Sequence, residues 1–222
     1  MNLALFDLDH TLLPLDSDHA WGEFTISLGW VGAQEFKRAN DAFYAQYKDG
    51  TLVAAEYVRF ATRAIREQGA TKSIAAHADF MRAVVQKGIK QSALDLVAQH
   101  RAAGDTLVLV TATNEFVTRP ICEVFGIEHL IAVELEHDAT GWYSGEILGT
   151  PSFREGKVAR VEQWLAARGK SWADVERSTF YSDSMNDLPL LEKVHTPVAT
   201  NPDDTLRAIA LERGWRILEL FT

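Results

Sequence analysis

The stretch Leu3-Ala4-Leu5-Phe6-Asp7-Leu8-Asp9-His10-Thr11-Leu12-Leu13 decides how this chain is interpreted. The apolar residues before Asp7 are typical of a short buried strand. Side chains alternate along a strand, so Asp7 and Asp9 lie on the same side, and we expect a turn near His10 that lets both carboxylates reach one ligand.

Two close carboxylates repel each other without a counter-charge. The pair Asp7 and Asp9 therefore predicts either a divalent metal site or a nucleophile beside an acid. Magnesium, a hard cation that prefers oxygen ligands, fits both readings. Taken alone, the pair also fits an N-cap and a solvated loop residue.

Three further polar groups lie beside predicted strand ends. They are Thr111 after the strand run 106–110, Lys157 in the amphipathic segment 155–167, and Asp183, Asn186 and Asp187 after strand 179–182. Each alone fits a capping, solvated or turn role. Their joint occurrence indicates one site, because ligands of open α/β sheets bind outside the carboxyl ends of the strands.

Strand and helix patterns alternate along most of the chain and predict an α/β fold with a doubly wound parallel sheet. The predicted strands are 3–8, 106–111, 129–135, 179–182, 197–200 and 215–220, and the predicted helices are 92–103, 117–125, 155–167, 186–193 and 203–213. The turn residues 138–141 predict a hairpin between two short strands.

Residues 16–87 break this alternation, because they have helical spacing throughout and no strand pattern. They are predicted to form a helical cap, with residues 1–15 and 88–222 forming the catalytic core. Helices packed on a sheet face fit the same pattern.

On these residues the chain resembles the haloacid dehalogenase (HAD) superfamily of phosphohydrolases, and within it subfamily IB, which contains phosphoserine phosphatase. The motif Asp-x-Asp-x-Thr is matched by Asp7, Asp9 and Thr11, and the remaining motifs by Thr111, Lys157, Asp183, Asn186 and Asp187. The resemblance spans essentially the whole chain. It implies a Rossmannoid core with an α-helical C1-type cap inserted after the first motif.

The resemblance also implies a mechanism for phosphate ester hydrolysis. Asp7 would form an aspartyl-phosphate, and Asp9 would protonate the leaving group and then activate water. Mg²⁺ would be held by Asp7, the Asp9 backbone carbonyl and Asp183. Thr111 and Lys157 would bind phosphoryl oxygens, while three residues would support this set: Asn186, Asp187 and Thr11.

Asp16 lies as far from the nucleophile as the acid that recognises the substrate amine in phosphoserine phosphatase. With Asp18 and Trp21, it would suit a cationic amino-alcohol phosphate such as phosphoserine or histidinol phosphate. Asp16 fits an N-cap equally well. Three cap arginines would either bind a substrate carboxylate or form a solvated face: Arg59, Arg63 and Arg66.

Composition sets wider bounds on function. The 222 residues are 47% hydrophobic and carry nine excess negative charges, which argues against general nucleic-acid binding. One cysteine, Cys122, and the lack of a signal peptide or a bilayer-crossing run predict a cytoplasmic protein without a membrane partner. The expected partner is a small-molecule phosphate ester, and the sequence does not indicate an oligomeric state.

Two other functions fit the same acidic strand ends. A phosphotransferase or phosphomutase would use the same aspartyl-phosphate and pass the phosphoryl group to another acceptor. A phosphoaccepting signalling domain would retain it. The presence of Asp9 and of a cap favours hydrolysis over both.

Overall fold

The computed structural model describes residues 1–221, apart from the side chains of Glu35 and Lys48. Within this range one sheet has six parallel strands in the order β3-β2-β1-β6-β7-β8. The strands are β1 Asn2–Phe6, β2 Thr106–Asn114, β3 His129–Val133, β6 Arg177–Ser182, β7 Thr196–Thr200 and β8 Arg216–Leu218. Since β1 lies at the centre, the carboxylates that follow it meet the ends of its neighbours β2 and β6.

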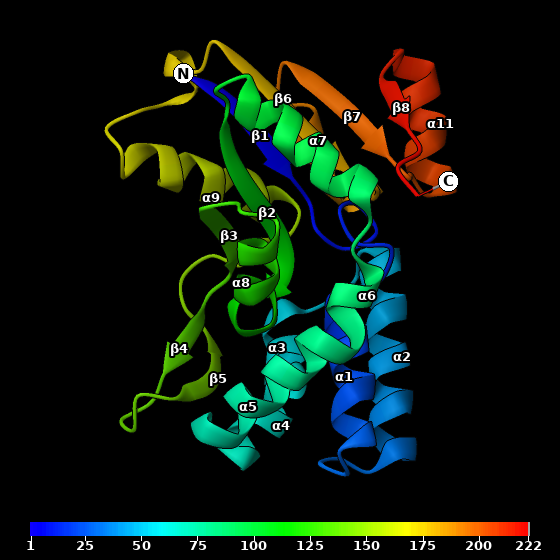
Figure 1. The fold of residues 1–222 in the computed structure, drawn as a ribbon, viewed down its shortest axis with the longest axis vertical. Helices are drawn as coiled ribbons and strands as arrows, with labels where there is room; N and C mark the ends of the chain where they lie inside the picture. Colours follow the sequence, from blue (N-terminus) through cyan, green and yellow to red (C-terminus); the bar gives the residue numbers. More distant parts are fainter. Residues whose placement is uncertain (222) are drawn as a thin grey trace.

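Both faces of the sheet are buried. Along β1, Ala4 and Phe6 belong to one apolar cluster and Leu3 and Leu5 to the other, as the two-residue repeat of a strand requires. Helices α7 Gln91–Ala102 and α8 Glu115–Val124 cover the first face, and α7 crosses in front of β1 in Figure 1. The second face is covered by α9 Glu155–Ala166, α10 Leu188–Leu191 and α11 Asp204–Arg213. This is the predicted doubly wound sheet.

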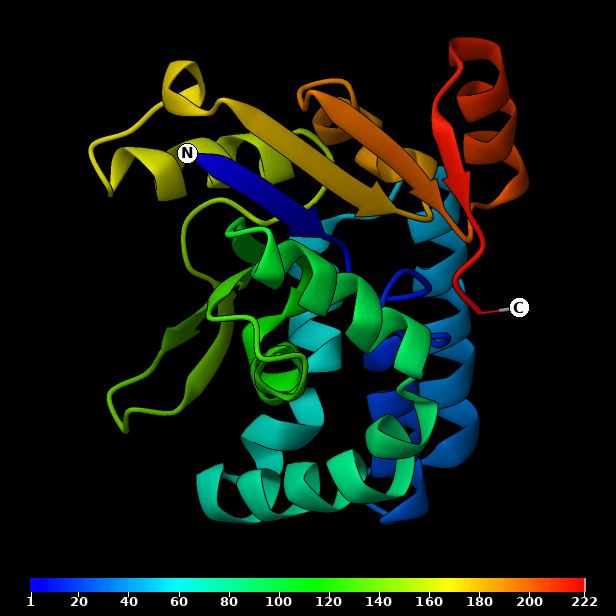
Figure 2. The ribbon, with the colours of Figure 1, turned by 45° about the horizontal axis from the view of Figure 1, so that its top comes forward.

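A helical insert follows β1 and occupies the space beyond one end of the sheet, as both views of the ribbon show (Figures 1 and 2). It contains α1 Ser17–Ser27, α2 Ala33–Asp49, α3 Ala54–Ala61, α4 Arg63–Gln68, α5 Ala70–Phe80, the π-helix η1 Met81–Val85 and α6 Gln86–Gly88. The predicted helical insert is therefore confirmed. The division into residues 16–87 and the remainder stays a prediction.

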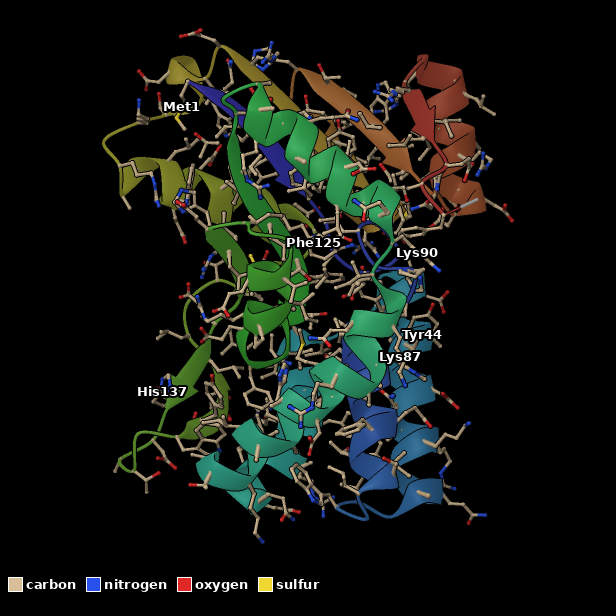
Figure 3. All side chains as sticks on the ribbon, viewed as in Figure 1. Met1, Tyr44, Lys87, Lys90, Phe125 and His137 are labelled. Carbon is tan, nitrogen blue, oxygen red and sulfur yellow. The ribbon has the colours of Figure 1, made fainter. Side chains whose placement is uncertain are left out.

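Aromatic side chains join the insert to the sheet. Trp21 of α1 lies 5.5 Å from Phe116 of α8 between ring centroids, and both belong to the apolar cluster that covers one sheet face. Side chains of the insert and of the sheet helices meet in this region (Figure 3). The apolar residues of the insert thus share one core with the sheet.

The predicted hairpin is confirmed as β4 Leu135–His137 and β5 Tyr143–Ile147, paired antiparallel. It packs beside the insert, where the Trp142 indole N–H donates to the Ile65 carbonyl at 2.9 Å. Strand β2 was predicted to end at Thr111, but it continues for three more residues and ends at Asn114. Two short 3-10 helices, η2 Trp172–Asp174 and η3 Met185–Asp187, complete the elements. Within residues 1–221, no helix is long and apolar enough to cross a membrane.

Candidate active site

A buried lysine joins two of the predicted acidic residues. Lys157 Nζ lies 2.7 Å from Asp7 Oδ1 and 2.7 Å from Asp187 Oδ2, and its side chain is almost fully buried. Burial opposes the charge of Lys157, but the carboxylates of Asp187 and Asp7 outweigh it and raise the lysine pKa. Lys157 therefore remains a cation beside the first carboxylate of the motif.

The first motif turns back on itself directly after β1. His10 has a φ of 55°, and the amides of Thr11, Leu12 and Leu13 all donate to the Leu8 carbonyl. The turn predicted near His10 is therefore confirmed. It brings the Thr11 hydroxyl to 3.5 Å from Asp7 Oδ2 and 3.2 Å from Asp183 Oδ1.

Asp9 has a separate set of partners. The Ser17 amide donates to its Oδ1 at 2.7 Å, and the Thr113 hydroxyl donates to its Oδ2 at 2.9 Å. Burial, together with the nearby carboxylates of Asp16 and Asp7, raises the pKa of Asp9 well above its usual range. A carboxyl group with a raised pKa is suited to carry a proton.

The strand-end charges leave room for a divalent cation. Asp7, Asp183 and Asp187 surround only one charged amine, Lys157, so two negative charges remain when all three acids are ionised. Burial raises the pKa of Asp7 to about 6, and desolvation with the adjacent Asp7 raises that of Asp183 well above its usual range. A hard cation at this position would favour the ionised forms of both acids.

The neighbouring polar atoms are also compatible with magnesium. Asn186 Oδ1 is buried and lacks a hydrogen-bond partner among the described residues, so it offers an acceptor to a metal-bound water. No group of three or more acidic, histidine or cysteine side chains within residues 1–221 forms a metal cage. The Asp9 carboxylate is hydrogen-bonded to Ser17 and Thr113, so its backbone carbonyl would be the group of Asp9 that is free to bind a metal.

A cavity of about 820 Å³ opens between these strand ends and the helical insert. Its core side includes Asp7, Thr111 and Asp183, and its insert side includes Tyr44 of α2, which Figure 3 locates. Eight aspartates line it: Asp7, Asp9, Asp16, Asp18, Asp49, Asp183, Asp203 and Asp204. Among the described side chains, no lysine or arginine lines it.

The haloacid dehalogenase-like hydrolase family matches residues 4–192, which include strands β2, β3 and β6, the insert and all four motifs. The chain belongs to this family.

Similar proteins support the assignment of this HAD-like hydrolase. A histidinol-phosphatase of Neisseria meningitidis serogroup C (strain 8013) is 42% identical over 217 residues, which are 98% of each chain. The crystal structure of a protein of unknown function from Bordetella pertussis Tohama I has a TM-score of 0.93 and 49% identity over 99% of each chain. A substrate-bound phosphoserine phosphatase is 16% identical with a TM-score of 0.64, over 98% of this chain and 92% of its own. The HAD-like hydrolase is accordingly a phosphatase, and its fold is phosphoserine-phosphatase-like.

The structure of this HAD-like hydrolase brings most of the predicted site residues together. Hydrogen bonds link Asp7, Thr11, Lys157, Asp183 and Asp187. Asn186 lies on the same loop and donates to the Tyr47 carbonyl of the insert at 2.8 Å. Thr111 lines the cavity and accepts from the Thr113 amide at 3.1 Å.

Trp21 is not placed to contact a substrate, contrary to the prediction from sequence. It is 2% exposed, does not line the cavity, and packs against Phe24, Phe80 and Phe116. It shares the buried face of α1 with Asp18 but lies nearly one turn further along the helix, about 4.5 Å from Asp18 along the helix axis. Its role is to fill the core between the insert and the sheet.

The three cap arginines also lie outside the cavity lining. Arg59 pairs with Glu146 of the hairpin at 2.7 Å, Arg63 pairs with Glu67 at 2.8 Å, and Arg66 donates to the Arg59 carbonyl. Arg59 and Arg63 are exposed and follow the solvated-face alternative, whereas Arg66 is half-buried.

Asp16 lines the cavity and also caps α1, because its Oδ1 accepts from the His19 amide at 2.8 Å. The predicted capping role is therefore present, and the side chain remains half-buried at the cavity wall. Its part in substrate binding stays a prediction.

Sequence reasoning missed Thr113 as the partner of Asp9 and underestimated Asp18. Asp18 is buried at the cavity wall, and burial raises its pKa to about 7. For Thr113 the available signal was the second hydroxyl of Thr111-Ala112-Thr113, which has the same strand parity as the first.

Proposed function

We propose that this HAD-type phosphatase is a magnesium-dependent phosphomonoesterase that hydrolyses histidinol phosphate through an aspartyl-phosphate. The observation that carries the substrate proposal is the charge of the cavity, which combines eight aspartates with no described lysine or arginine in its lining. Such a cavity favours a leaving group that bears positive charge.

The same charge argues against phosphoserine. Its carboxylate would enter a cavity of like charge, where repulsion and desolvation cost binding energy. Histidinol phosphate carries an ammonium and an imidazole and lacks a carboxylate. The 42% identity to a histidinol-phosphatase over 98% of both chains supports the same choice.

The residues around Asp7 and Asp9 are suited to two in-line steps. The Asp7 carboxylate attacks phosphorus, the bond to the ester oxygen breaks, and the proton of Asp9 passes to the leaving alcohol. Water then attacks the aspartyl-phosphate, Asp9 takes the water proton, and inorganic phosphate leaves Asp7.

Lys157 and Thr111 would hold the phosphoryl oxygens, where negative charge develops. Asp187 and Ser182 hold Lys157 in place, since both Lys157 Nζ and the Ser182 hydroxyl donate to Asp187 Oδ2 at 2.7 Å. Magnesium held by Asp7, Asp183 and the Asp9 carbonyl would neutralise charge on the transferring phosphoryl group.

Phosphate release from four esters tests the proposal: histidinol phosphate, phosphoserine, phosphoethanolamine and glycerol phosphate. Each is assayed with magnesium and with a chelator, and Asp7→Asn serves as the blank. We expect magnesium-dependent turnover with the highest kcat/KM for histidinol phosphate. Preference for phosphoserine would refute the charge argument, while a stable phosphoprotein or an isomerised sugar phosphate would replace hydrolysis with signalling or mutase chemistry.

The cytoplasmic location and the absence of a nucleic-acid partner stay predictions from the sequence. The division of the chain into core and cap is likewise part of this proposal, since cap residues would close over the phosphate ester.

A further inference from the structure

A polar recess lies in the cavity wall where the helical insert meets β2. It is formed by Asp18 of α1, Asn40 and Phe43 of α2, and Tyr57 of α3, all of which line the cavity. Asp18 and Asn40 are 6% and 4% exposed. We refer to these four residues as the ring recess.

Asp18 is held in place by neutral donors. The Tyr57 hydroxyl donates to Asp18 Oδ2 at 2.5 Å, and Asn114 Nδ2 donates to Oδ1 at 3.3 Å. Neither donor carries a charge to balance an ionised carboxylate. A buried acid that faces a cavity in this state is suited to a ligand that brings an N–H donor or a positive charge.

The ring recess lies on the side of the cavity toward which the leaving group must extend. Ser17 and Thr113 bind the Asp9 carboxylate, and the next residues of the same two segments, Asp18 and Asn114, bind each other. Because Asp9 protonates the departing alcohol, the substituent of that alcohol lies beyond Asp9. Asp18 is thus placed to meet the leaving group and not the phosphoryl group.

Asn40 supplies the complementary donor. Its Nδ2 is buried and has no hydrogen-bond partner among the described residues. An unpaired buried amide is unfavourable unless a ligand or water satisfies it. Phe43 and Tyr57, whose ring centroids are 5.4 Å apart, add flat apolar walls to the same recess.

We propose that the ring recess binds the imidazole of the substrate, with Asp18 accepting a ring N–H and the unpaired Asn40 amide turning toward the cavity to donate to the second ring nitrogen. A neutral imidazole has one N–H and one acceptor nitrogen, which match this pair of side chains. The half-buried Asp16 then faces the ammonium group, which has three donors and remains better solvated. This inference rests on the proposed function and assigns its specificity to Asp18.

The experiment compares kcat/KM for histidinol phosphate with kcat/KM for phosphoethanolamine, which has the amine and lacks the ring. We expect Asp18→Asn to lower this ratio about 10-fold to 100-fold, the range for a hydrogen bond to a charged group. Asp49→Asn removes the same charge from an exposed position of the same cavity and should keep the ratio within about twofold. Asp16→Asn should weaken both amine substrates and leave the ratio nearly as it was.

An unchanged ratio in folded Asp18→Asn, or an equal fall in Asp49→Asn, would overturn the assignment of the ring recess. If Asp18→Asn fails to fold, Tyr57→Phe removes a donor that fixes Asp18 and must lower the same ratio. Calorimetric titration of the Asp7→Asn protein with histidinol is an independent readout, because binding should weaken when Asp18→Asn is added. Absence of turnover on histidinol phosphate would refute the proposed function, whereas Asp18-independent histidinol binding would refute only the ring recess.

Discussion

Replacing Thr113 by valine tests the assignment of Asp9 as the residue that gives and takes the proton. Valine has nearly the same shape, so Thr113→Val removes the hydroxyl that donates to Asp9 Oδ2 at 2.9 Å and leaves the Ser17 amide as the remaining donor. Thr113 is 7% exposed, so water has little access to replace the lost donor.

The expected magnitude follows from the loss of one hydrogen bond to a buried carboxylate. Such a bond contributes about 1.5–3 kcal/mol, which corresponds to about one to two pKa units. Since the hydroxyl stabilises the ionised form, its removal raises the pKa of Asp9 further. A larger fraction of Asp9 is then protonated at neutral pH and cannot accept the proton of the hydrolytic water, so we expect kcat to fall about 10-fold or more.

Rapid-quench measurements with labelled substrate distinguish the two steps. We expect the phosphorylated fraction of Thr113→Val to rise, because dephosphorylation is slowed more than phosphorylation. Thr205→Val, which removes an exposed hydroxyl from the same cavity, is the matched control. The reasoning is refuted if Thr113→Val keeps the kcat and the pH profile of the wild type while remaining folded.

Two further predictions concern stability. Lys157→Met leaves Asp7 and Asp187 without their shared buried cation, so the free energy of unfolding in urea should fall by about 3–5 kcal/mol and turnover should be lost. A fall in the unfolding free energy of less than about 1 kcal/mol would contradict this prediction. His77 donates from Nε2 to the Val117 carbonyl, and burial lowers its pKa. The unfolded chain then binds the proton more tightly than the folded protein. The unfolding free energy of the wild type, measured relative to that of His77→Gln, should therefore fall as the pH drops below about 6.5. A difference between the two proteins that does not change with pH would exclude this titration.

Much of the fold follows from local patterns. The strand before Asp7, the turn at His10 and the hairpin at residues 138–141 depend on periodicity and turn chemistry within a few residues. The end of β2 was predicted too early. The residues Thr111-Ala112-Thr113-Asn114 contain no local signal that marks where the strand ends, and pairing of Asn114 with Val133 extends it. Tertiary pairing thus decided an element boundary that local propensity left open.

The nucleophile, its lysine and the second acidic loop were predictable because each follows or faces a strand end in a parallel sheet. Trp21 and Asp18 were not separable in the same way, since both lie on the buried face of α1. Packing of α1 against α8 directs Trp21 into the aromatic core and leaves Asp18 at the cavity wall. Helical spacing defines a face and does not define which end of that face meets a ligand.

The sequence by itself determined the family, the parallel sheet and the convergence of Asp7, Lys157 and Asp183, because strand order and residue spacing along single elements suffice for these. Only the tertiary structure decided that Thr113 holds Asp9, that the three cap arginines lie outside the cavity lining, and that Asp18 and Asn40 share one recess. These contacts join residues from separate elements, and the packing of the insert on the sheet determines their distances. The motifs therefore identify the reaction, whereas the assembled cavity carries the information about the substrate.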